Sequence, residues 1–286
     1  MPRVLVIGDV IDDILVTPDG AIRVDTDTQS QIFSSPGGSG ANFAAWLASL
    51  GAEVDFVGRV GRADIERHSV ALRNVGVTPH LQADDLLETG KIIVLVQGDT
   101  RSFLTDRGAN QNLDVGAIDK ALLSDALYVS GYSVFDSEPE ALLSLIKDAR
   151  KKGIVMCDPG SAGFIQDHGA SRFLNSLAGV SLLVPSLQEG KVLAGELAPE
   201  LIGDSLSRNF DQVVLTLGPQ GSIGFEKGKR FVIEPTQVLA IDPTGAGDAF
   251  AAKLLAELLG GKTLAQAQLA ASRFAALATT KSGGRP

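Results

Sequence analysis

The 286-residue chain has one cysteine, no long apolar run and no extended cluster of basic residues. A single cysteine excludes an intrachain disulfide and favours a reducing compartment, so we expect a cytoplasmic protein. No stretch approaches the roughly 18 apolar residues of a transmembrane helix, so no membrane partner is expected. The longest basic run is residues 150–152 and the net charge is −9, so we expect no nucleic-acid partner either.

Histidine is scarce too, and His68, His80 and His168 lie far apart in the sequence. Their spacing does not suit a zinc site, and we expect them to be ordinary surface side chains. The lone Cys157 follows the apolar run 154–156, which is typical of a buried strand. We therefore interpret Cys157 as a small core side chain in preference to a nucleophile.

Glycine, by contrast, is abundant, with 32 residues in the chain. These glycines have no three-residue period, which excludes a collagen-like chain. They are densest at residues 37–40 and 245–247. Because glycine is needed where the backbone turns sharply or approaches a ligand closely, these two clusters are candidate binding loops.

The first hundred residues combine strands with one clear helix. Short apolar runs predict strands at residues 3–8 and 54–57. Between them, apolar residues recur with helical spacing from residue 43 to residue 50 and predict an amphipathic helix that ends at Gly51. The other expected strands are residues 21–33, where polar residues alternate, and a hairpin of residues 91–97 and 101–105 joined by the loop 98–100.

From residue 114 onwards, expected helices and strands alternate. The strands are residues 126–130, 154–158, 182–185 and 212–217, with a further β-rich patch at 222–241; the helices are residues 115–123, 138–152, 171–178, 199–209, 246–259 and 263–278. Apolar strands separated by helices predict a parallel sheet covered on both faces. We therefore predict one three-layer α/β domain, with segments near 14–34 and 89–106 pairing into a small β-sheet.

The most informative segment is residues 242–250, with the sequence DPTGAGDAF. A helix is expected to begin near Ala246, so Gly245 and Gly247 leave its first N–H groups uncovered as an anion site. Asp248 lies in the same turn and suits a base that takes a proton from a hydroxyl attacking the anion. That division of labour is the one phosphoryl transfer needs. Alternatively, Asp248 only stabilises the helix N-terminus.

Two other loops place polar groups at the end of a strand or the start of a helix. Residues 36–42, PGGSGAN, bring the backbone close to a polar ligand with Asn42 in contact, or form a tight connection with Asn42 as a helix cap. Residues 8–13, GDVIDD, follow the first strand, at the end where parallel sheets bind ligands. A carboxylate there would hold sugar hydroxyls, or these aspartates belong to a solvated turn.

Together, these loops resemble the ribokinase-like (PfkB) carbohydrate kinase family over nearly the whole chain. Residues 37–42 and 242–250 resemble its two signatures, residues 216–221 (TLGPQG) its nucleotide loop, and Gly8 with Asp13 its substrate-binding opening. The resemblance implies a three-layer αβα ribokinase-like fold with a central, mostly parallel sheet and a small β-sheet lid. The implied core is residues 1–13, 35–88 and 107–286, and the implied lid is residues 14–34 and 89–106.

The resemblance also implies an ATP-dependent kinase, a phosphotransferase that uses Mg²⁺ and phosphorylates a primary hydroxyl of a small sugar or sugar acid. Asp248 resembles the catalytic base, with Gly245, Ala246 and Gly247 as the anion hole. The implied substrate-binding residues are Asp13, Gly37, Gly38, Asn42 and Arg107. The implied nucleotide-binding residues are Ser186, Thr216, Gly218 and Gly221, and the implied metal positions are Glu189 and Asp242, the latter for a monovalent cation such as K⁺.

This sequence departs from the family pattern at several positions. The family's N-x-x-E motif appears as residues 186–189, with Ser186 in place of asparagine, and a hydroxyl lacks the geometry of an amide. Ile11, Ser39 and Tyr132 stand where ribokinase itself has asparagine, lysine and an acidic contact, which argues against ribose as the substrate. Arg107 stands near an arginine that binds the substrate carboxylate in 2-keto-3-deoxygluconate kinases; alternatively it faces solvent or forms an ion pair on the lid.

Two other functions remain open at this stage. A nucleoside kinase would need an apolar pocket for a base, to which Phe33, Phe103 and Tyr132 would contribute. A non-catalytic protein that binds sugars or nucleotides is supported by Ser186, whereas the intact turn at Asp248 argues against it. In this family lid strands often pair between subunits, so the resemblance also implies a homodimer formed through the lid.

Overall fold

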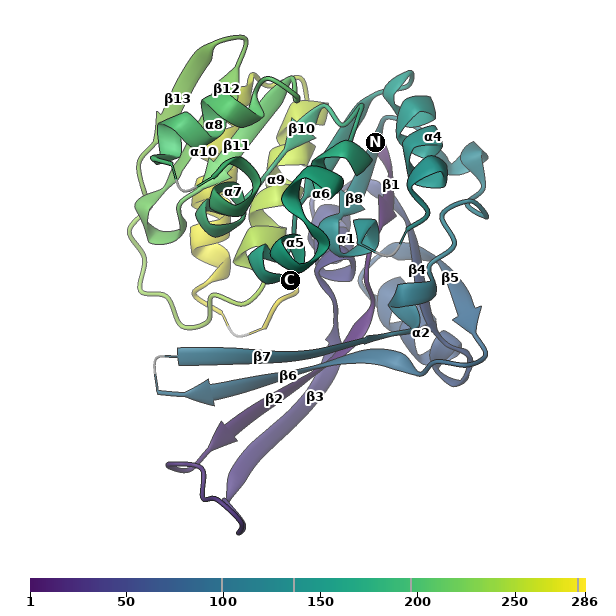
Figure 1. Ribbon diagram of the computed structural model, residues 1–286, viewed down its shortest axis with the longest axis vertical. Helices are drawn as coiled ribbons and strands as arrows, with labels where there is room; N and C mark the ends of the chain where they lie inside the picture. The colour runs from purple at the N-terminus through teal and green to yellow at the C-terminus, as the bar shows by residue number, and fades with distance from the viewer. Residues whose placement is uncertain (99, 136, 196, 282) are drawn as a thin grey trace.

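A mixed sheet runs through the centre of the molecule. The computed structural model describes residues 1–98, 100–135, 137–195, 197–281 and 283–286. The strands of this sheet are β1 (Arg3–Ile7), β4 (Glu53–Gly61), β5 (Val77–Asp84), β8 (Ala126–Ser130), β9 (Ile154–Asp158), β10 (Leu182–Leu183), β11 (Gln212–Thr216), β12 (Ser222–Glu226) and β13 (Lys229–Ile233). Their spatial order is β13-β12-β11-β10-β9-β8-β1-β4-β5 (Figure 1). The strands from β11 to β5 run parallel, whereas β12 and β13 extend the sheet in antiparallel fashion.

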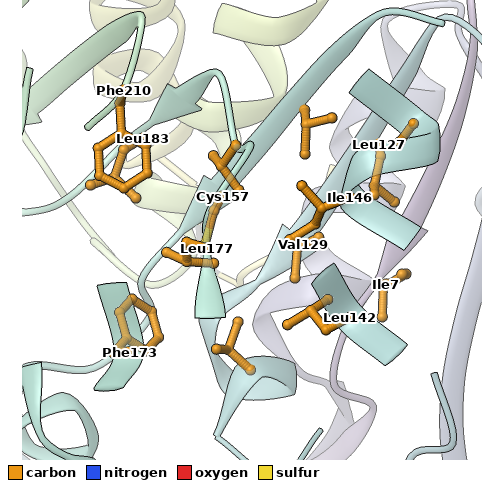
Figure 2. Packing of buried hydrophobic residues seen from close by; sticks show 14 of the residues in the cluster. Ile7, Leu127, Val129, Leu142, Ile146, Cys157, Phe173, Leu177, Leu183 and Phe210 are labelled. Atoms are coloured by element: carbon orange, nitrogen blue, oxygen red, sulfur yellow. The ribbon is translucent and has the colours of Figure 1, made fainter. Parts of the chain in front are cut away.

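Helices cover both faces of this sheet, as the apolar strands predict. One face is covered by α1 (Ser39–Ser49), α2 (Ile65–Asn74), α9 (Ala246–Leu259) and α10 (Leu264–Ala278), and the other by α4 (Pro139–Arg150), α5 (Ala162–His168), α6 (Ala170–Ser176), α7 (Leu187–Ala194) and α8 (Pro199–Leu206). Successive residues of β1 alternate between the two cores: Val4 and Val6 pack in the first, and Leu5 and Ile7 in the second. Figure 2 shows the second core, in which Cys157 is fully buried.

The lid is a second sheet of four strands that projects from the central domain (Figure 1). Its strands are β3 (Ser30–Gly37), β2 (Ile11–Pro18), β6 (Thr89–Gln97) and β7 (Thr100–Gly108), in that order. The expected hairpin is confirmed as the antiparallel pair of β6 and β7; Asp99 of its expected loop lies outside the described residues. The α/β fold with a mostly parallel sheet and a small β lid is therefore confirmed.

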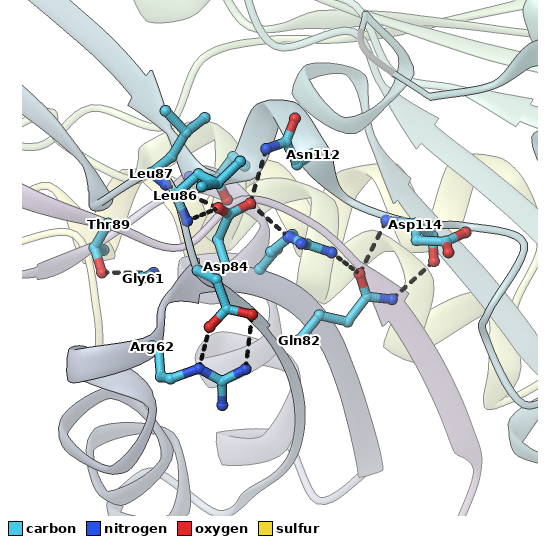
Figure 3. A network of polar contacts seen from close by, with 12 residues as sticks. Gly61, Arg62, Gln82, Asp84, Leu86, Leu87, Thr89, Asn112 and Asp114 are labelled. Carbon is cyan, nitrogen blue, oxygen red and sulfur yellow. Dashed lines mark hydrogen bonds and ion pairs between the residues drawn. The ribbon is translucent and has the colours of Figure 1, made fainter.

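A buried carboxylate fixes the place where the lid joins the central sheet. Asp84, at the end of β5, accepts hydrogen bonds from the backbone N–H groups of Leu86 and Leu87 and from the side chains of Asn112 and Arg59 (Figure 3). These bonds, led by the one from Leu87, hold the pKa of Asp84 well below its usual range. Because Asp84 is ionised and 3% exposed, the loop that leads from β5 to β6 is anchored by a satisfied charge.

Two predicted elements are wrong and a third is too long. The β-rich patch expected at 222–241 ends with β13 at Ile233. The strand expected at 21–33 begins only at Ser30, and residues 21–27 are exposed turns in which Asp25 has a φ of 56°. Ile22 and Val24 alternate with charged residues there but stay 48% and 85% exposed, so no buried apolar face holds the segment as a strand. The helix expected at 115–123 contains only a 3-10 turn, Lys120–Leu122. Asp114 and Asp119 accept hydrogen bonds from nearby backbone N–H groups, and such local bonds compete with a helix.

One histidine is not where the sequence predicts it, and several helices and strands were not predicted. His68 is not a surface side chain: it is 1% exposed on the inner face of α2, 3.5 Å from Asp12. The helices α2, α5 and α7 and the strand β5 were not predicted. No helix in the described part of the chain is long and apolar enough to cross a bilayer.

Candidate active site

Two cavities lie on either side of the start of α9. The first, of about 890 Å³, is bounded by the carboxyl ends of parallel strands and by the lid; the second, of about 470 Å³, lies between α9, α10 and the loop after β11. Of the residues expected from the sequence, the first is lined by Asp13, Gly38, Asn42, Arg107, Ser186, Glu189, Thr216, Gly245, Ala246, Gly247 and Asp248, and the second by Thr216, Gly218, Gly221, Ala246 and Gly247. Gly37 lies against the Asp13 carboxyl, and Asp242 against Arg101.

The wall between the cavities is the first turn of α9, which begins at Ala246. Gly245 precedes it in the left-handed conformation, with a φ of 73°. A Cβ on Gly245 would lie 2.5 Å from the carbonyl oxygen of Gly284, whereas a Cβ on Gly247 would meet nothing within 4 Å. The backbone of the turn is therefore packed on its protein side at Gly245 and open on the cavity side at Gly247, as an anion-binding turn requires.

Asp248 lies in this turn and receives hydrogen bonds from two side chains. The Ser39 hydroxyl donates to its Oδ1 at 2.7 Å, and the Asn42 side chain also hydrogen-bonds the carboxylate. Burial on the cavity floor, helped by the nearby charges of Asp9 and Asp13, raises the pKa of Asp248 to about 7. A carboxylate with such a pKa can both accept and release a proton near neutral pH.

Asp9 is central to the geometry, although Asp13 was the aspartate singled out in the loop after β1. The Asp9 carboxylate accepts hydrogen bonds from the backbone N–H groups of Ser39 (2.9 Å) and Gly40 (3.0 Å) and from the Ser130 hydroxyl (3.0 Å). Asp9 thereby caps the N-terminus of α1 from a neighbouring segment. It fixes the position of Ser39, which in turn contacts Asp248.

The glycines at 37–40 are required by this same packing. A Cβ on Gly40 would lie 2.4 Å from the Cα of Gly8, and one on Gly38 would lie 2.4 Å from the carbonyl oxygen of Asp9. Gly38 also has a φ of 100°. The cluster therefore allows the end of β1 to pack closely against the start of α1, besides lining the cavity at Gly38.

On the substrate side of the larger cavity, Asp13 and Asn42 both interact with Arg285, which was not predicted as a site residue. Burial raises the pKa of Asp13 to about 6, and the positive charge of Arg285 opposes that rise. Arg285 donates from Nε to Asn42 Oδ1 at 2.8 Å and from Nη2 to the Gly37 carbonyl oxygen at 3.0 Å. No local pattern marks Arg285, because it reaches these groups across more than 240 residues of sequence.

Ser186 and Glu189 form the start of α7. The Ser186 side chain accepts from the Glu189 N–H at 3.4 Å, and Glu189 Oε2 accepts from the Ser186 N–H at 2.7 Å. This capping box gives the serine a role in the helix terminus in the place where the family motif has asparagine. Burial raises the pKa of Glu189 and, together with the charge of Glu189, that of Asp158 on the same cavity wall.

Two arginines of the lid strand β7 reach the central domain. Arg101 Nη1 donates to Asp242 Oδ1 at 2.9 Å and to Thr244 Oγ1 at 2.6 Å. Arg107 donates to the Tyr132 carbonyl oxygen, with its guanidinium 5.6 Å from the centre of the Phe135 ring. The lid is thus tied to the loop before α9 by one arginine and to the far cavity wall by the other.

Comparison with known proteins agrees with this geometry. Residues 1–286 match the family model of the pfkB family carbohydrate kinases. The chain is 28% identical over 297 residues to ribokinase of Bacillus subtilis, covering 100% of this chain and 95% of that protein. It is 30% identical over 311 residues to the bifunctional protein HldE of Shewanella piezotolerans, covering 98% of this chain but only 60% of the length of HldE.

Solved structures show the same fold. An adenosine kinase from Sinorhizobium meliloti matches with a TM-score of 0.88 at 22% identity, covering 100% of this chain and 96% of that one. A putative ribokinase II from E. coli, solved in complex with ATP and Mg²⁺, matches with a TM-score of 0.83 at 23% identity, covering 99% and 94%. The match of the family model over the whole chain shows that this protein belongs to the pfkB family of carbohydrate kinases and is a phosphotransferase.

Proposed function

We propose that this kinase transfers the γ-phosphoryl group of ATP to a primary hydroxyl of a small sugar or sugar acid, with Asp248 as the general base. The observation that carries the proposal is the position of Asp248 in the first turn of α9, between two cavities. The larger cavity would hold the sugar substrate, whose hydroxyl accepts the phosphoryl group, and the smaller one the adenine nucleotide. Gly218 and Gly221, which line the smaller cavity, belong to the expected nucleotide loop.

In this mechanism, the substrate hydroxyl lies against Asp248 and loses its proton to that carboxylate as its oxygen bonds to the γ-phosphorus. The bond from the γ-phosphorus to the bridging oxygen breaks, and ADP leaves with that oxygen. The N–H groups of Gly245, Gly247 and Asp248 face the negative charge on the transferring group and stabilise it, whereas the Ala246 N–H donates to the Pro243 carbonyl oxygen at 3.2 Å. Asp13 and Asn42 hold other hydroxyls of the substrate and orient the attack. Closure of the lid, which we assign to residues 14–34 and 89–106, excludes water and limits ATP hydrolysis.

Mg²⁺, when bound with ATP, neutralises phosphate charge. The described residues contain no group of three or more His, Cys, Asp or Glu side chains arranged to hold a metal. The ion would therefore be held mainly by phosphates and water, with Glu189 receiving a hydrogen bond from a metal-bound water. One oxygen of Glu189 is used by the Ser186 N–H, which leaves the other for this contact.

A monovalent cation at Asp242 does not fit the residues as they stand. The two oxygens of Asp242 accept hydrogen bonds from the N–H groups of Thr244 and Gly283 and from Arg101. Although burial acts to raise it, these bonds hold the pKa of Asp242 well below its usual range. A cation such as K⁺ would have to displace the Arg101 guanidinium, so we assign the positive charge at this loop to Arg101.

A nucleoside is the second candidate substrate. Phe103 and Tyr132 both line the larger cavity, and register across the lid places Phe33, Leu15, Val94 and Phe103 in one row. Such a row offers an apolar surface for a base, whereas Arg107 in the same cavity favours an acidic sugar.

Phe33 and Phe103 are more than half exposed, and exposed apolar side chains on the lid also support a homodimer formed through it.

A panel of phosphate acceptors tests the proposal. We expect ADP release, coupled to a spectroscopic assay, with at least one of 2-keto-3-deoxygluconate, fructose or ribose, and faster than with adenosine. Adenosine as the best acceptor would replace the sugar assignment by the nucleoside one. Release that no acceptor increases above the ATP-only rate would contradict the assigned acceptors and point to a different alcohol.

We expect kcat/KM to rise with pH along an acid limb centred near pH 7. Asp248 accepts a proton only when it is ionised, and its pKa is raised to about 7. Asp13, with a pKa of about 6, adds a second fall at lower pH. The measurement is kcat/KM for the best acceptor between about pH 5 and 9, because this ratio reports the free enzyme. A rate that is constant from pH 5 to 8 would contradict the base assignment.

A further inference from the structure

The Arg285 side chain is half-buried, and its guanidinium forms hydrogen bonds with residues at the rim of the substrate site. Two of its nitrogens donate to Asn42 Oδ1 and to the Gly37 carbonyl oxygen, at 2.8 and 3.0 Å. The segment that carries it is anchored at two further points. The Trp46 indole N–H donates to the Gly284 carbonyl oxygen at 2.9 Å, and the Gly283 N–H donates to Asp242 at 3.0 Å.

This arrangement decides which way the Asn42 amide faces. Arginine can only donate hydrogen bonds, so the oxygen of Asn42 must point to Arg285. The Nδ2 group is then free to donate to Asp248, which the side chain of Asn42 contacts. With the amide reversed, Nδ2 would face a guanidinium N–H and Asp248 would face an oxygen, so both contacts would be repulsive.

Arg285 also faces an unusual concentration of negative charge. Asp9 from the end of β1, Asp13 from β2 and Asp248 from α9 all interact electrostatically with its guanidinium. Asp248 is faced in addition by Asp158 from β9. Because an opposite charge favours the ionised form of a carboxyl, Asp13 and Asp248 would hold their protons to higher pH if this cation were lost.

We propose that Arg285 is a positioning residue for phosphoryl transfer: it turns the Asn42 amide toward Asp248 and places a positive charge beside Asp13 and Asp248. The inference rests on the proposed role of Asp248 as the base. It gives the segment after α10 a function in catalysis. Burial lowers the pKa of Arg285 itself, and the three carboxylates oppose this, so the guanidinium stays charged.

The test compares the pH profiles of kcat for the full-length wild type, Arg285→Met and Arg285→Lys, with the best acceptor and saturating ATP. In Arg285→Met we expect the acid limb to move to higher pH by about one unit, since one opposite charge within a few ångström shifts a carboxyl pKa by about 1–3 units. At pH 6.5 this shift alone is roughly a tenfold loss of kcat. At pH 9 that part is recovered, and the severalfold loss caused by the missing contact with Asn42 remains. Arg285→Lys keeps the charge without the two-pronged contact, so its limb stays near that of the wild type while the plateau falls severalfold.

A matched control is Arg59→Met. Arg59 is also a partly buried arginine that bonds an aspartate, Asp84, at 2.9 Å, but it lies outside the cavity lining. We expect this variant to lose stability without moving the acid limb. An Arg285→Met limb that coincides with that of the wild type, or an Arg285→Lys limb displaced as far as that of Arg285→Met, would overturn the proposal. A wild type without an Asp248-dependent limb would instead show that the base assignment itself is wrong.

Discussion

Replacing Asp248 by asparagine is expected to lower kcat by about 10²-fold or more and to leave ATP binding nearly intact. The amide can still accept the hydrogen bond from Ser39, which donates at 2.7 Å in the native protein. It cannot take the proton of the attacking hydroxyl. Turnover is measured by coupled ADP release, and nucleotide affinity by calorimetry with ADP. Unchanged turnover in this variant would exclude Asp248 as the base.

The same variant has an expected effect of opposite sign on stability. The pKa of Asp248 is raised in the folded protein, so the folded state binds a proton that the unfolded state releases between about pH 4 and 7. The free energy of unfolding of the wild type therefore falls as pH rises through this window. Asparagine removes that cost, so Asp248→Asn should melt roughly 2–4 °C above the wild type at pH 8 and close to it at pH 4.

A control aspartate separates the two effects. Asp55 is 7% exposed and is paired with Arg3 and His80, away from the cavities. These partners lower its pKa, so Asp55→Asn should lose stability above the unfolded pKa and keep its turnover. If both variants lost stability at pH 8, the raised pKa of Asp248 would be contradicted even where its loss of turnover was confirmed.

The sequence predicts the chemistry of the site where the residues involved are close together in the chain. Two glycines, a helix start and Asp248 fall within residues 245–248, so their geometry follows from how helices begin. The layers of the fold are legible for a similar reason, because an apolar strand needs cover on both faces and the helices between the strands supply it. Short helices such as α5, of seven residues, carry too few turns for their apolar spacing to be distinguished from a loop.

What the sequence does not show are the contacts between distant segments. Arg101 meets Asp242 across 141 residues, and Ser39 meets Asp248 across 209. Arg101 and Ser39 alone resemble ordinary surface or turn residues. Their partners are set by which strand ends lie side by side, and that order is a property of the folded sheet. Asp9 is one of the three aspartates in the loop that the sequence marks as a candidate site. Only its hydrogen bonds to the start of α1 distinguish it from Asp12 and Asp13.

Two neighbouring glycines of the anion turn should respond to alanine in different ways. Gly245→Ala forces a side chain into the left-handed conformation, at a φ of 73°, and places its Cβ 2.5 Å from the Gly284 backbone. The turn and the segment that carries Arg285 must therefore move apart. We expect a loss of about 1–3 kcal/mol in the free energy of unfolding and at least 10²-fold in kcat, as for other displaced anion-hole donors.

Gly247→Ala serves as the matched variant. Its Cβ would meet nothing within 4 Å, and alanine is the better helix former, so stability should stay equal or rise by up to about 1 kcal/mol. The added methyl nevertheless occupies the side of the turn that faces both cavities. If a phosphate approaches that backbone, KM for ATP should rise and kcat should fall about tenfold without any loss of stability. A stable Gly247→Ala enzyme with wild-type kinetics would mean that the transferring group does not approach this backbone and binds elsewhere.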